Sequence, residues 1–111
     1  MTIKTPALRS KKLTEGAKGK QCSLQIPGVC TFNPETVVFA HLPSGTQGMA
    51  YKSDDFWGVD ACMGCHDAID GRNGYRFEPG EKEQYLLQAL HITLSRRIRD
   101  GIIVIQGATY V

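Results

Sequence analysis

Apolar residues recur at intervals of three and four in one long segment, residues 81–99, as one face of a helix requires. The residues that share this face are Leu87, Leu90, Leu94 and Ile98. Glutamates stand in the first turn and arginines in the last, which suits the helix dipole, and Gly101 follows as a stop signal. The segment therefore predicts a long helix whose leucine face is the main packing partner of the core.

β-Branched and aromatic residues, which favour strands, gather in shorter segments. Residues 36–42 are the best strand candidate, and residues 55–62 are a second one that Gly58 weakens. Residues 43–54 contain a proline and two glycines and read as a surface loop. The apolar residues 102–106 predict one more short strand. Helices and strands together indicate the α+β class.

The composition fits one small domain of 111 residues with 41% apolar and 22% charged residues. A core of this size is often reinforced by a metal ion or by disulfides. No apolar run approaches the roughly 18 residues that span a bilayer. The first residues also lack the apolar centre of a signal peptide, so we expect a cytoplasmic protein with no membrane partner.

Charge is spread unevenly along the chain. Residues 1–20 hold six of the 13 lysines and arginines but only one of the 11 acids, Glu15. We therefore expect a basic, loosely ordered arm over residues 1–18, followed by a single domain over residues 19–111. Such an arm suits DNA, although a solvated tail explains the charge equally well. The candidate DNA contacts in this part of the chain are Lys11, Lys12, Lys18 and Lys20.

The four cysteines form two pairs, Cys22-x7-Cys30 and Cys62-x2-Cys65. Residues 21–30 read as a short strand with a Pro-Gly turn that folds Cys30 back toward Cys22. Four thiolates favour one closed, structural Zn²⁺ site. A redox couple of Cys62 and Cys65 is the alternative, and it leaves the other pair unexplained. His66, next to Cys65, is an alternative ligand.

Zinc bound by both pairs would bring the strand that carries His41 toward the segment that follows Cys65. His66 and Asp70 are four apart and share a face if this segment is a helix, so together they can hold a divalent ion such as Mg²⁺. His41 is then the base that deprotonates water for attack on a phosphodiester. A core histidine bonded to a backbone carbonyl is the simpler alternative for His41.

Other titratable residues have weaker predicted roles. Asp67 is expected to cap the helix start or to contact His41. Asp55 and Asp60 lie on or beside the second strand, where each either orients His41, binds metal or is simply solvated. His91 falls among the leucines of the long helix and is expected to be partly buried without a catalytic role.

Three segments together resemble the HNH, or His-Me finger, nucleases, and more closely the YbcO-like nucleases of prophages. The segments are residues 18–30 (KGKQCSLQIPGVC), 33–42 (NPETVVFAHL) and 61–70 (ACMGCHDAID). The resemblance covers about half of the chain, from Gly19 to about Arg72.

The resemblance implies a zinc-stabilised ββα-metal core, extended here by a C-terminal helix and a short strand. It assigns His41 as the general base and places His66 and Asp70 where the family binds its catalytic ion. It implies metal-dependent hydrolysis of DNA in phage or prophage recombination or processing. Arg72, like the lysines of the arm, is a candidate contact to the DNA backbone. Ala40 stands where the family often has a metal-binding Asp or His.

The usual Asn of the family loop is also missing, and Asp55 lies near its place. These departures favour the alternative function, a non-catalytic zinc module that binds DNA or a recombination or replication protein. In that alternative the zinc and the basic arm matter and His41 does not.

Overall fold

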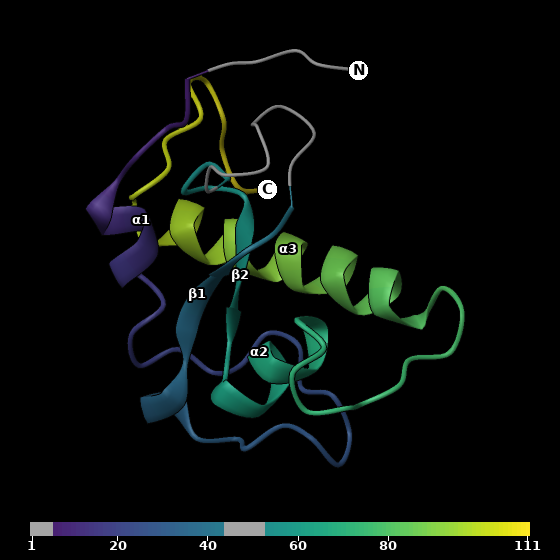
Figure 1. Ribbon diagram of the computed structural model, residues 1–111. Coiled ribbons are helices and arrows are strands. Elements are labelled where there is room, and N and C mark those ends of the chain that lie inside the picture. The colour runs from purple at the N-terminus through teal and green to yellow at the C-terminus, as the bar shows by residue number, and fades with distance from the viewer. Residues whose placement is uncertain (1–5, 44–52) are drawn as a thin grey trace.

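The computed structural model describes residues 6–43 and 53–111, which form an α+β fold with a two-stranded sheet (Figure 1). The elements in chain order are α1 (Lys11–Glu15), the 3₁₀ helix η1 (Pro34–Thr36), β1 (Val38–His41), β2 (Gly58–Ala61), α2 (Met63–Ile69) and α3 (Glu81–Arg99). Figure 1 shows α3 crossing the hairpin of β1 and β2, with α2 below the end at which β2 finishes. The mixed helix-and-strand class expected from the sequence is confirmed.

β1 and β2 lie inside the two predicted strand segments and pair antiparallel, with Val38 opposite Ala61 and His41 opposite Gly58. Gly58 helps this pairing instead of weakening it. A Cβ atom at position 58 would stand 2.5 Å from both the Ala40 carbonyl oxygen and the Phe39 ring. The strands approach so closely beside His41 because position 58 has no side chain.

We expect Gly58→Ala to destabilise the protein by about 1–3 kcal/mol, because the added methyl group must push the strands apart. The drop in melting temperature measures this cost. Val38→Ala on the exposed start of β1 is the comparison, since it changes a strand residue without crowding the partner strand. An unchanged melting temperature in Gly58→Ala would refute the close packing.

α2 contains the segment after Cys65 and begins two residues earlier than Cys65, at Met63, because Cys62 caps it. The Cys65 amide donates a hydrogen bond to the Cys62 Sγ atom at 3.4 Å, in the way that a serine or aspartate caps a helix. The helix ends at Asp70, and Gly71 then adopts a φ of 74°. Cys62 and Cys65 therefore lie together at the helix start.

α3 has the bounds predicted from the sequence, but the expected leucine face is only partly right. Leu90 is half-buried against the core, whereas Leu87 is 72% exposed, and the residues fully buried on α3 are Ala89, Thr93 and Arg97. The most buried face is the one on which Arg97 pairs with the buried carboxylate of Asp60 on β2. His91 is exposed on this helix, not partly buried.

Three further expectations differ from the structure. Residues 102–106 form bends and irregular chain, and residues 21–30 form bends and a turn, without a strand in either segment. The Ile102 and Ile103 amides bond back to the Arg97 carbonyl, and the Ile26 amide bonds the Cys65 sulfur, so these amides are not free to pair with a strand. The arm over residues 1–18 is not loosely ordered from residue 6 onward. α1 forms there, and its Leu13 and the nearby Ala17 are buried. Residues 1–5, and residues 44–52 of the predicted loop, lie outside the described part of the chain.

Candidate functional site

The four cysteines meet in one cluster between the 22–30 turn and the start of α2. Their Sγ atoms all lie within 4.8 Å of one another, and the Sγ atoms of Cys30 and Cys62 are 3.7 Å apart. A tetrahedral zinc ion with Zn–S bonds of about 2.3 Å places its sulfurs roughly 3.8 Å apart. The cluster can therefore hold one metal ion such as zinc with little rearrangement.

Backbone amides point at every sulfur of the cluster. Ile26 donates to Cys65, Thr31 to Cys62, Phe32 to Cys30 and Cys62 to Cys22, at 3.3–3.4 Å. The turns that supply these amides contain Gln25 (φ 47°) and Phe32 (φ 53°), which are non-glycine residues in the left-handed region. Such strained conformations persist where the surroundings fix them, and here they aim N–H groups at the Sγ atoms.

Shared hydrogen bonds and burial shift the pKa values of the thiols in different directions. The bond from the Cys65 thiol, aided by amides, lowers the pKa of Cys22 to about 4 despite burial. The same shared bond, together with burial, raises the pKa of Cys65, and burial raises the pKa of Cys30 to about 11. Cys65 is fully buried, so a redox couple with Cys62 is disfavoured, since reactive thiols are exposed and acidic.

His41, at the end of β1, is held by a buried carboxylate. Its Nε2 atom lies 2.8 Å from the Asp55 Oδ1 atom, and the Phe39 ring meets the imidazole edge-on with centroids 5.0 Å apart. Asp55 is 7% exposed. Burial works to raise the pKa of Asp55, but bonds from His41 and the Ser10 amide and the charge of Arg9 lower it overall. An ionised Asp55 therefore orients His41.

His66 and Asp70 share one face of α2, as their spacing predicts. The His66 Nε2 atom is 3.2 Å from the Asp70 Oδ2 atom. Arg72 also bonds this oxygen at 2.7 Å, and it bonds Asp67 at 2.9 Å. Asp67 thus pairs with Arg72, neither capping α2 nor contacting His41. An ion bound by His66 and Asp70 would have to compete with the Arg72 guanidinium.

His41 with Asp55 and His66 with Asp70 form two pairs on different elements, with no hydrogen bond or ion pair between them among the described residues. Within residues 6–43 and 53–111, the cysteines are the one group of three or more side chains placed to share an ion, so His41, His66 and Asp70 do not form a second. The register explains this separation, since His41 pairs with Gly58 whereas α2 follows the other end of β2.

The candidate DNA contacts differ in how they are engaged. Lys20 pairs with Asp100 at 2.8 Å and Lys11 with Glu15 at 3.8 Å, while Lys12 and Lys18 are exposed. Arg72 is exposed but neutralised by its two aspartates. No helix of the described residues is long and apolar enough to cross a membrane.

Asp60 has none of the roles expected from the sequence: it is buried, not solvated, and among the described residues it neither bonds His41 nor belongs to the metal-binding cluster. This carboxylate is 0% exposed and accepts hydrogen bonds from Arg97 at 3.0 Å and Arg96 at 3.2 Å, while the Asp60 amide donates to the Thr93 hydroxyl. The small residues at four-residue spacing on α3, Ala89 and Thr93, were the available signal, because they mark the face that approaches β2.

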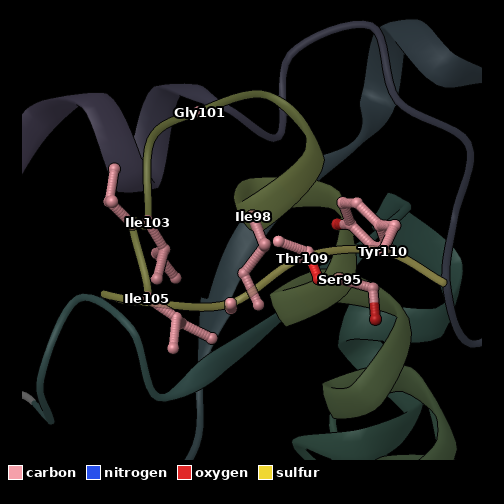
Figure 2. A pocket seen from close by; sticks show the side chains of 9 residues that line it. Ser95, Ile98, Gly101, Ile103, Ile105, Thr109 and Tyr110 are labelled. Atoms are coloured by element: carbon pink, nitrogen blue, oxygen red, sulfur yellow. The ribbon is translucent and has the colours of Figure 1, made fainter.

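A separate apolar cavity of about 370 Å³ lies between the end of α3 and the C-terminal segment. Figure 2 shows Ile98, Ile103, Ile105 and Tyr110 around it. Its lining contains none of the candidate catalytic or metal-binding residues, so it is not part of the site described above.

Fold and site together define a small α+β protein whose four-cysteine cluster can hold one metal ion. The family described as "Putative nuclease YbcO" matches residues 11–100, and the chain belongs to this family. Proteins of that name from Escherichia coli (strain K12) and Enterobacteria phage 82 are each 36% identical over 92 residues, which cover 82% of this chain and 95% of the relative.

A solved structure has a similar fold. It is titled "Structure of a putative bacteriophage protein from Escherichia coli str. K-12 substr. MG1655", and it is 33% identical with a TM-score of 0.64. The similarity covers 80% of this chain and 99% of that chain.

Proposed function

We propose that the protein is a metal-dependent endonuclease of the HNH type that hydrolyses DNA phosphodiester bonds in a phage or prophage setting. The cysteine cluster carries a structural zinc ion, and His41 is the general base. The observation that carries this proposal is the bond between His41 and the buried Asp55, because it gives the imidazole one defined orientation.

The bond also assigns the basic atom of the imidazole. An ionised carboxylate only accepts hydrogen bonds, so Asp55 requires the hydrogen on the Nε2 atom of His41. The lone pair of the neutral ring is then on Nδ1, and this atom takes the proton from the attacking water. Asp55 stabilises the imidazolium that results, as buried carboxylates do beside catalytic histidines.

His66 and Asp70 are the residues proposed to hold the catalytic Mg²⁺ or similar ion. Their imidazole and carboxylate lie 3.2 Å apart on an open helix face, which fits two ligands of a site completed by water and phosphate. When bound, such an ion stabilises the charge that develops on phosphate. Arg72 is near enough to contact the DNA backbone once Asp70 is engaged by the ion.

The proposal is tested with purified protein, supercoiled plasmid and linear single-stranded DNA, with or without added Mg²⁺ or Mn²⁺. Omitting the added ion, without using a chelator, leaves structural zinc in place. We expect ion-dependent cleavage that falls about 10²- to 10⁴-fold in His41→Ala, the usual loss when a general base is removed.

His91→Ala is the matched control, since it removes an exposed histidine of α3 that lies outside the candidate site. Equal rates of DNA cleavage by His41→Ala and the parent would refute the role of His41 as general base. DNA binding without cleavage in both proteins would support the second candidate function.

That second candidate is a non-catalytic zinc module that binds DNA or a recombination or replication protein. Two observations favour it. Ala40, which is 1% exposed, places a methyl group in the core where the HNH pattern often has a metal ligand. Arg72 already neutralises Asp70. The module requires zinc and the basic residues and is indifferent to His41.

A further inference from the structure

Residues Leu8–Ser10, here called the N-terminal strap, bond along the segment that carries Asp55. The Leu8 amide donates to the Asp54 Oδ1 atom at 2.7 Å, and the Asp55 amide donates to the Leu8 carbonyl at 2.9 Å. Arg9 donates to the Ser53 carbonyl at 2.7 Å. These contacts join positions more than 40 residues apart in the chain.

The strap also occupies the carboxylate that orients His41. The Ser10 amide donates to the Asp55 Oδ2 atom at 2.7 Å, and Arg9 donates to the Oδ1 atom at 3.3 Å. His41 shares that Oδ1 atom. Both oxygens of Asp55 are therefore bonded, and the rotation of the carboxylate that would release the imidazole is blocked from the strap side.

The strap itself is fixed by the rest of the fold. Ser10 caps α1, its hydroxyl accepting from the Leu13 amide at 3.3 Å. The Leu13 carbonyl in turn accepts from the buried Arg97 of α3 at 2.9 Å. A continuous set of bonds thus runs from α3 through α1 and the strap to Asp55.

We propose that the N-terminal strap is a positioning device for His41, with Arg9 as its positioning residue. The proposal rests on the proposed role of His41 as general base. It gives part of the basic N-terminal segment a task apart from DNA contact, since Arg9 acts on the imidazole through Asp55. Catalysis is sensitive to such support, because a misplacement of about 1 Å costs up to about 100-fold in rate.

The test compares Arg9→Ala with Arg76→Ala, which removes the same charge from an exposed site between α2 and α3. The first readout is the ¹⁵N NMR spectrum of the His41 ring, which needs no activity. We expect one tautomer, protonated on Nε2, in the parent and in Arg76→Ala. In Arg9→Ala we expect a tautomer mixture or exchange broadening, partly restored in Arg9→Lys.

The second readout is the kinetics of DNA cleavage. We expect Arg9→Ala to lower kcat by about 10- to 100-fold. If the loss of a positive charge from the N-terminal segment only weakens DNA binding, KM rises and kcat does not change. Lys11→Ala measures the size of that effect. A melting temperature and a zinc content close to those of the parent show that Arg9→Ala is folded. Arg9→Lys, which retains the charge, carries the test if Arg9→Ala is not folded.

The positioning role of the strap is refuted if Arg9→Ala leaves the His41 spectrum unchanged while Asp55→Asn changes it. A loss confined to KM and equal to that of Lys11→Ala would also refute it. If no variant, including the parent, cleaves DNA, the proposed nuclease function fails, and the NMR comparison still decides whether the strap orients His41.

Discussion

Replacing Cys65 with serine is expected to unfold the protein. Structural zinc contributes roughly 10–16 kcal/mol in small zinc domains, which matches or exceeds the 5–15 kcal/mol that stabilises a typical domain. Serine leaves three thiolates for the ion and a buried hydroxyl at the start of α2. We expect loss of bound zinc by elemental analysis and loss of the cooperative thermal transition by circular dichroism.

Ala68→Ser is the matched control for this substitution. It also places a hydroxyl at a buried position of α2, but it leaves all four sulfurs in place. We expect this variant to keep its zinc and to unfold cooperatively at a moderately lower temperature. A Cys65→Ser protein with the parent's melting temperature and no zinc would show that the cluster does not hold a structural metal ion.

Removing the Arg97 side chain is expected to cost up to about 3–5 kcal/mol, because it leaves the buried Asp60 charge with the single, longer bond from Arg96 at 3.2 Å. Arg97→Met preserves most of the side-chain length. The lost free energy of unfolding therefore measures what the charge and the hydrogen bonds of the guanidinium contribute, including the bond to the Leu13 carbonyl. The free energy of unfolding from urea titrations measures it, provided that the slope with denaturant concentration is unchanged.

The double variant Asp60→Asn with Arg97→Met separates the ion pair from the rest of the loss. We expect it to be more stable than Arg97→Met alone, since a neutral amide is cheaper to bury than an unpaired carboxylate. If the losses of unfolding free energy caused by the two substitutions are instead additive, Asp60 and Arg97 do not stabilise each other, and Arg96 alone neutralises the carboxylate.

The parts of the fold that follow from local chemistry could be predicted from the sequence. The bounds of α3 follow from acidic and basic ends and a glycine stop, and both strands fall within β-branched and aromatic segments. The four-cysteine cluster was also predicted, because a two-residue spacing and a Pro-Gly turn each bring sulfurs together. The pairing of His66 with Asp70 followed from their spacing of four on a helix.

The remaining features depend on contacts between distant segments. Leucine periodicity predicted the buried face of α3 only in part, because the most buried face is the adjacent one, whose Arg97 pairs with a buried carboxylate on β2. The bond between His41 and Asp55 was one of three roles left open for Asp55, because the choice among them depends on the path of the chain between the two strands. Nothing local in the arm reveals that Arg9 and Ser10 reach Asp55.

The bond from Arg97 to the Leu13 carbonyl sets an order of events during synthesis. The ribosome makes the chain from its N-terminus, so α1 emerges more than 80 residues before its partner on α3. Until Arg97 has left the exit tunnel, the Leu13 carbonyl lacks this partner. The set of bonds that runs from α3 through α1 to Asp55 is therefore completed only after α3 has been made.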